Sequence, residues 1–488
     1  MKNFFLLSFL VLCLCACSVT ENNIRTKYDS ANYISTYKGL QEAASKKNTN
    51  SLLWQMQSGF LNFSYFGPEF SIEDLDIAEK VYKKYEDEGI LSGAFSTVAA
   101  TFTNDRVLPY RGYVYEGSLL NFYKAMAYSS INDYTNARIE FNRANDRQRR
   151  AKDYYKKEIK KAHDKAVMNA NTKQRNADYA INTSDEALDG IISSKYSNLS
   201  NFAIYKDLIN PAIPYLSGVF FMLEDDYVKS VDLLKEAYGI SRAPLIADDM
   251  KLLDSRRLGK DSDKYTWFFI EDGDISRKHG ITFAVTLWLG GSVSSINIAL
   301  PFLGEGKPSF RSYKINGHEA NLIVTNSNLF GSEFEKQLPS IITRALISAI
   351  AKFTVSYLTS ELGSEIGGLL TSLVFNVITA VDTRSSFVLP HAVWAVRIPN
   401  VEGDIEMLGG NSVFPRFSFT KKCDSLTKRL EANRTFNALF KDKPKDLSAR
   451  IKYLEQHKQT SDICLNSDNI VYVRVRGGVA RQFIIRGD

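Results

Sequence analysis

Two stretches in the first half of the chain share one spacing of small, aromatic and apolar residues, over 125–144 and 218–237. Counted from the first small residue, each has an aromatic residue at +3, Asp-Tyr at +8 and +9, a small residue at +12, a large apolar residue at +16 and alanine at +19. Apolar residues at three- and four-residue spacing predict helices over both stretches. The packing positions are Ala125, Tyr128, Tyr134, Ala137, Phe141 and Ala144, then Gly218, Phe221, Tyr227, Leu234 and Ala237.

The shared spacing resembles the tetratricopeptide repeat, in which small residues let two helices approach and aromatic residues fill the space beside them. A third, degenerate candidate covers residues 51–85, where Ala78 and Tyr82 keep the second-helix spacing and Gly67-Pro68 interrupts the first helix. An unrelated helical bundle is the alternative. The resemblance implies that the first helix of each hairpin, including Asn121 and Ser217, faces an open groove that binds partners.

The second half of the chain has the composition of strands. Runs rich in aromatic and β-branched residues predict strands at 265–270, 281–289, 294–300 and 396–398. Asn316-Gly317 and Gly477-Gly478 each lie between two such runs and predict tight hairpin turns. We therefore expect an α+β fold, with an all-helical tetratricopeptide-like domain over residues 51–255 and a β-rich, sandwich-like domain over residues 256–488.

One apolar stretch inside the second half is predicted to be a helical insertion at residues 339–381. Part of it, residues 363–381, is long enough to be considered as a membrane span. Glu365 and Asn376 lie within that part, and polar groups without partners are costly in a bilayer. A helical hairpin buried against the sheet is therefore the favoured interpretation.

The amino-terminal segment indicates export and lipid attachment. Lys2 is followed by an apolar run over residues 4–14 that is too short to cross a bilayer, which is typical of a signal peptide, here residues 1–16. Leu14, Cys15 and Ala16 precede Cys17, and together they resemble the lipobox of bacterial lipoproteins. The resemblance implies that Cys17 carries the lipid and that residues 17–50 form the anchor and a tether. Plain secretion without a lipid is the alternative.

The charge, the cysteines and the residue after Cys17 indicate the location of the protein and the kinds of partner it can have. Ser18 is not the aspartate that retains such lipoproteins at the inner membrane, which favours the outer membrane, facing the periplasm. The net charge of +6 is small for 488 residues and, with export, argues against a nucleic-acid partner. Cys423 and Cys464 remain after the signal is removed and form a candidate disulfide in an oxidising compartment. The basic stretch 143–166 is interpreted as a solvated helix.

A short motif after the predicted insertion gives a second resemblance. Asp382, Thr383 and Arg384 are followed by Leu389-Pro390, and an Ala-Leu-Pro segment over 299–301 precedes them. With the helical hairpins, this order resembles a family of uncharacterised bacterial repeat-containing lipoproteins, although Ser386 replaces the usual tryptophan. The resemblance implies a role in the cell envelope and no particular activity. Asp382, Arg384 and Pro390 are predicted to form a structural corner, the alternative being a catalytic acid with a substrate clamp.

The histidines and glycines of the chain form none of the common enzyme motifs. The five histidines are scattered without metal-ligand spacing, and no Gly-x-Ser-x-Gly, Walker or HExxH motif occurs. No metal or cofactor is predicted. The sequence thus favours a non-enzymatic scaffold that binds a protein partner in the envelope, held to the membrane by its N-terminal lipid. The alternative is an envelope enzyme, such as a cell-wall hydrolase, with a site assembled from distant residues.

Overall fold

The fold is that of a computed structural model. It describes residues 21–46, 48–87, 109–150, 190, 192–201, 208–289, 292–339, 341–342, 345, 381–414, 417–440, 446–457 and 462–487. The predicted signal peptide, Cys17 and most of the predicted insertion at 339–381 lie outside these residues. In the described part of the chain, no helix is both long and apolar enough to span a membrane.

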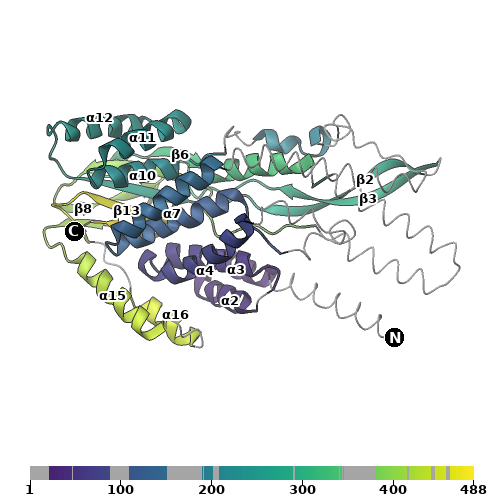
Figure 1. Ribbon diagram of the computed structural model, residues 1–488, viewed down its shortest axis with the longest axis horizontal. Coiled ribbons are helices and arrows are strands. Elements are labelled where there is room, and N and C mark those ends of the chain that lie inside the picture. Colours follow the sequence, from purple (N-terminus) through teal and green to yellow (C-terminus); the bar gives the residue numbers. More distant parts are fainter. Residues whose placement is uncertain are drawn as a thin grey trace.

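Helices form the amino-terminal half of the structure (Figure 1). The first covers residues 21–29 and another covers 134–150, while a helix at 326–339 lies in the second half, between the strands at 321–325 and 392–399. The others are α2 (Tyr33–Ser45), α3 (Ser51–Leu61), the π-helical turn η1 (Asn62–Phe66), α4 (Pro68–Asp87), α7 (Val114–Ser130), the 3-10 turn η3 (Ser197–Asn201), α10 (Ala212–Leu223), α11 (Tyr227–Ser241) and α12 (Pro244–Arg257).

The Asp-Tyr pairs of the shared spacing occupy the turns of two helical hairpins. After α7 and α10 the chain takes the left-handed conformation at Asn132 (φ 61°) and Asp225 (φ 56°). The next residue, Asp133 or Asp226, begins the second helix as its N-cap. Its carboxylate accepts a hydrogen bond from the backbone N–H three residues on, at 3.1 Å for Asp133 and 3.3 Å for Asp226. The recurring aspartate is therefore a helix cap.

The small residues lie where the helices of each hairpin cross. A Cβ atom built on Gly218 would lie 2.8 Å from Cδ2 of Leu234, sixteen residues along the chain. The same relation holds between Gly59 and Leu75 in the α3–α4 hairpin, at 2.7 Å. Ser71 and Ala78 then stand at the same offsets of twelve and nineteen residues. The spacing that begins at Gly59 extends the pattern to a third hairpin.

Five strands form the main sheet, in the order β14-β13-β1-β7-β6. Its central strand β1 pairs in parallel with β13 and antiparallel with β7. The strands are β1 (Tyr265–Asp272), β6 (Asn321–Thr325), β7 (Ala392–Pro399), β13 (Asn469–Arg476) and β14 (Val479–Arg486). The turn between β13 and β14 is at Gly477-Gly478, as predicted, with φ angles of 56° and 83°.

Smaller sheets complete the strand region. One has the order β10-β9-β4-β5, one β12-β11-β8, and β2 pairs only with β3 among the described strands. The predicted turn at Asn316-Gly317 joins β4 to β5. These strands are β2 (Lys278–Leu289), β3 (Ser292–Leu303), β4 (Tyr313–Ile315), β5 (His318–Glu319), β8 (Gly403–Ile405), β9 (Met407–Gly409), β10 (Ser412–Val413), β11 (Phe417–Thr420) and β12 (Asp462–Cys464).

The main sheet is covered on both faces. Alternate residues of β1 point to opposite sides. Trp267 and Phe269 enter the large core that the sheet shares with the helices, whereas Phe268 and Ile270 enter a second core shared with the small sheets. The predicted α+β class, with amino-terminal helices and carboxy-terminal strands in several sheets, is confirmed. The predicted boundary at 255/256 follows the change from helix to strand, but the two regions share one core.

Two helices near the carboxy terminus pack against the α3–α4 hairpin. These are α15 (Ser425–Phe440) and α16 (Leu447–Gln456). The amide of Asn433 donates to the Glu69 carbonyl oxygen, and Arg450 lies 3.2 Å from the Asp74 carboxylate. The rings of Phe70 and Phe436 pack with centroids 5.1 Å apart. The carboxy-terminal region therefore adds helices to the amino-terminal layer, which the predicted two-domain division does not include.

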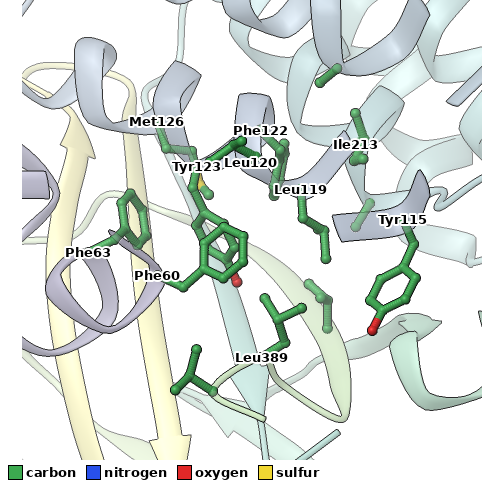
Figure 2. Close-up of a cluster of buried hydrophobic side chains, with 14 of the residues drawn as sticks. Phe60, Phe63, Tyr115, Leu119, Leu120, Phe122, Tyr123, Met126, Ile213 and Leu389 are labelled. Atoms are coloured by element: carbon green, nitrogen blue, oxygen red, sulfur yellow. The ribbon is translucent and has the colours of Figure 1, made fainter. Parts of the chain in front are cut away.

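The predicted open groove is absent from the described hairpins, because the main sheet fills its place. Figure 2 shows the rings of Phe60, Phe63 and Tyr123 packed together beneath α7. The ring of Tyr215 on α10 packs on Phe269 of β1, with centroids 5.3 Å apart. Both inner helices are thus buried between the sheet and their partner helices.

Asn121 and Ser217, expected on an exposed face, are fully buried. The Asn121 amide donates to Glu140 at 2.6 Å, and the Asn145 amide donates to the Ser217 hydroxyl at 3.0 Å. The expectation that they lie on an exposed helix face is wrong. The tether predicted at 17–50 is also corrected, since residues 21–46 are largely helical and bury Ile24 and Tyr37 in the large core.

We expect Gly218→Ala to lower the free energy of unfolding by about 1 to 3 kcal/mol, because the new methyl group overpacks the helix crossing at Leu234. Gly239→Ala is the matched control on α11, where a built Cβ meets nothing within 4 Å. Alanine there should stabilise the helix by up to about 1 kcal/mol. Chemical denaturation of both variants measures the difference. Equal stability of the two variants would contradict the close crossing.

Candidate ligand-binding pocket

A polar pocket of about 450 Å³ opens where several distant segments meet. Its wall comprises the turns that follow α7 and α10 at Asn132 and Asp225, the connection between α12 and β1, the loop before β13, and the end of β14. The left-handed turns allow both hairpins to end at this place. Arg138 joins them through an ion pair of 2.7 Å with Asp226. The pocket is therefore built on helix and strand ends.

The cations of the pocket wall are already paired. Arg256 donates to the Asp468 carboxylate at 2.8 Å and to the Asp263 carbonyl oxygen at 3.0 Å. Lys264 lies 3.5 Å from the other Asp468 oxygen. Arg486 donates to Glu224 at 2.5 Å, and its guanidinium carbon lies 4.3 Å from the centre of the Tyr134 ring. These contacts hold the two arginines in place and leave them little capacity for an anionic ligand.

Three carboxylates of the wall form no ion pair with the described residues. Asp225 accepts from the Tyr227 hydroxyl at 2.8 Å. Asp261 accepts from the Asp263 N–H at 3.0 Å and from the Tyr265 hydroxyl at 3.4 Å. The Asp263 side chain lies in the wall and is exposed. The four aspartates and three cations of the wall give the pocket a net negative charge. The sequence did not reveal this, because Asp225 lies on a hairpin turn far along the chain from the connection that carries Asp261 and Asp263.

The predicted corner forms a buried ion pair. Arg384 donates from Nε and Nη2 to the two Asp382 oxygens, at 2.9 and 2.8 Å, and from Nη1 to Asn50 at 2.8 Å. Burial alone would raise the pKa of Asp382, but the Arg384 guanidinium holds it well below its ordinary value. The Pro390 carbonyl oxygen accepts from Asn326 at 3.3 Å. These contacts join distant segments, which favours the structural interpretation over catalysis.

Three buried acids that the sequence analysis did not single out connect the helices to the strands. Glu271 of β1 accepts from the Tyr123 and Tyr472 hydroxyls at 2.7 and 2.6 Å. Asp249 of α12 accepts from Trp267 at 3.0 Å and from Arg397 at 2.5 Å. Glu116 of α7 accepts from the Tyr110 hydroxyl and the Ser386 N–H. Burial raises the pKa of all three carboxyl groups. An acid within an apolar run, as in Trp267 to Asp272, is the only sequence signal for them.

One serine and histidine pair has the contact of a hydrolytic dyad, with Ser327 Oγ 2.8 Å from His391 Nδ1. Ser327 is 1% exposed, and its oxygen accepts from the Ser276 N–H at 3.0 Å. A Cβ built on Gly306 would lie within 2.2 Å of both the serine oxygen and the histidine nitrogen. The backbone at Gly306 thus covers the pair, and a substrate cannot reach the serine in this arrangement.

The predicted cysteine pair is joined in the structure. A disulfide links Cys423 to Cys464 and encloses α15 and α16 in its loop. Among the predicted packing residues, Ala125, Ala137, Phe141 and Ala144 are buried, as are Phe221, Leu234 and Ala237. Tyr128, Tyr134 and Tyr227 are partly buried against the same core. The predicted positions thus lie in the hairpins, away from any open site except Tyr134, which reaches the pocket.

We expect Asp382→Asn to destabilise the fold by about 3 kcal/mol at neutral pH, because Arg384 would lose its counter-charge in a buried place. The folded-state pKa of Asp382 lies below its unfolded value of about 3.9. Its stabilisation is therefore complete above roughly pH 5 and declines as the pH falls below about 4. Unfolding of parent and variant from pH 3 to 7 should show a gap that narrows with acid. A constant gap would contradict the ion pair.

The resemblances to repeat proteins and lipoproteins rest on the chain's own residues. No protein-family model matches the chain, and no curated protein or solved structure is similar to it. The geometry of the pocket is therefore the basis for proposing its role.

Proposed function

We propose that this protein is a lipid-anchored scaffold of the cell envelope, and that it binds a protein partner through the pocket at the hairpin turns. The observation that carries the proposal is the construction of the pocket. Five segments of the chain converge on it, and paired arginines hold its wall in place. A preorganised polar wall favours binding because few side chains must be ordered when the partner arrives.

The short distance between the predicted lipid site and the folded body supports a role at the membrane surface. The helix at 21–29 is described from Glu21, four residues after Cys17. Four residues span at most about 14 Å when extended. A lipid on Cys17 would therefore hold the helical layer against the bilayer, on the periplasmic side of the outer membrane.

Binding is favoured over the alternative of a cell-wall hydrolase by the covered Ser327 and His391 pair. The pocket wall itself contains no cysteine or histidine. Its serines, Ser262 and Ser467, have no histidine beside them in the wall to act as a base. We propose no cofactor or nucleic-acid partner.

Replacing Cys17 with alanine should abolish lipid attachment, since the thiol that accepts the lipid is lost. Incorporation of a radioactive fatty acid by growing cells measures attachment, and Cys423→Ala is the control that removes a cysteine elsewhere. Equal labelling of the Cys17→Ala variant and the parent would disprove the anchor.

Filling the pocket should prevent capture of the partner. Ser262 is exposed in the pocket wall, so Ser262→Trp should reduce binding at least tenfold while the melting temperature stays within 2 °C of the parent. Ser45→Trp, on the exposed end of α2, is the matched control. Crosslinking from position 262 in living cells identifies the partner, whose purified form is then titrated against each variant. Unchanged binding by Ser262→Trp would show that the pocket is not the binding site.

A further inference from the structure

We propose that the pocket receives an organic cation, the ammonium or guanidinium group of a lysine or arginine side chain presented by the protein partner. This inference rests on the proposed function, because it names the chemistry by which the scaffold recognises its partner. It is carried by the charges of the wall, by their separation and by the size of the pocket.

The charges of the pocket wall favour a cationic ligand over an anionic one. Arg486 pairs with Glu224, whereas Arg256 and Lys264 share the Asp468 carboxylate. The four aspartates and three cations of the wall leave a net charge of −1. Asp225 and Asp261 accept only from hydroxyl or N–H groups in the part of the chain that the structure describes. A ligand that donates charged hydrogen bonds would compensate these carboxylates, whereas an anion would add to the negative charge.

The carboxylates lie on different segments of the wall, which favours an extended cation with several donors. Within the described residues, no group of three or more acidic, histidine or cysteine side chains is arranged to hold a metal ion. Asp225 belongs to the α10–α11 turn, while Asp261 and Asp263 belong to the connection before β1. An ammonium group offers three donors and a guanidinium group five, which suits acceptors spread around a wall.

The size and lining of the pocket fit a side chain with its neighbouring backbone. A volume of about 450 Å³ lies within the range of sites for small ligands. Leu223, which is partly exposed in the wall, supplies apolar surface for the methylene stem of a lysine or arginine. The exposed amides of Asn132 and Asn466 at the rim can bond to the peptide groups on either side.

The test uses full-length protein purified in detergent and titrated with short capped peptides. Acetyl-Gly-Arg-Gly-amide and acetyl-Gly-Lys-Gly-amide are compared with acetyl-Gly-Glu-Gly-amide and with spermidine, by calorimetry at low salt. We expect at least one basic peptide to bind at least tenfold more tightly than the acidic peptide, and more tightly than spermidine. Equal binding of basic and acidic peptides would overturn the proposal, and tighter binding of spermidine would overturn the assignment to a protein side chain.

The double variant Asp261→Asn with Asp263→Asn removes two charges and keeps the oxygen that accepts the Asp263 N–H. It should weaken binding of the basic peptide at least tenfold, whereas Glu319→Gln, an exposed acid on β5, should leave it unchanged. Parent-like binding by the double variant would overturn the proposal. If Ser262→Trp loses the partner but the parent binds no basic peptide, the proposed cation is rejected and the scaffold function stands. If the parent binds basic peptides but captures no protein partner, the scaffold function is rejected and the cation site stands.

Discussion

The contact between Glu271 and two tyrosines is the interaction on which the arrangement of helices over the sheet depends. Glu271 lies on the central strand β1 and is 3% exposed, and its oxygens accept from Tyr123 of α7 and Tyr472 of β13. A buried carboxyl group without such partners is strongly destabilising. The helical layer is therefore most stable in the position that brings Tyr123 to β1. Asp249 sets a second contact between α12 and the strands in the same way.

This docking decides which surfaces remain for function. The inner helices α7 and α10 pack on the sheet, so the face that an isolated array of repeats would offer to partners is lost. The ends of the hairpins stay open instead, and α12 and the loop before β13 close around them to form the pocket. The same sheet thus removes one binding surface and creates another.

The elements of the fold were largely predictable, because they depend on local patterns. The offsets in residues 125–144 and 218–237 predicted helical hairpins, and Asn316-Gly317 and Gly477-Gly478 predicted two turns that the structure confirms. The third hairpin was recognised only in part, because its spacing begins at Gly59 and its turn uses Gly67-Pro68 in place of Asp-Tyr. The predicted tether at 17–50 did not include the helix at 21–29 or the packing of 21–46 on the core, because a short helix carries little periodic signal of its own.

The sequence by itself determined the helices, the turns, the strand region and the cysteines available for pairing, since each depends on neighbouring residues or on a count. The tertiary structure alone decided the burial of Asn121 and Ser217 and the covering of Ser327 by Gly306. It also decided that Asp225 and Asp261 line one pocket. Spacing along a helix shows which residues share a face, but it does not show what that face contacts. That depends on the docking of segments hundreds of residues apart. Here the docking depends on the hydrogen bonds that the buried Glu271 accepts from Tyr123 and Tyr472.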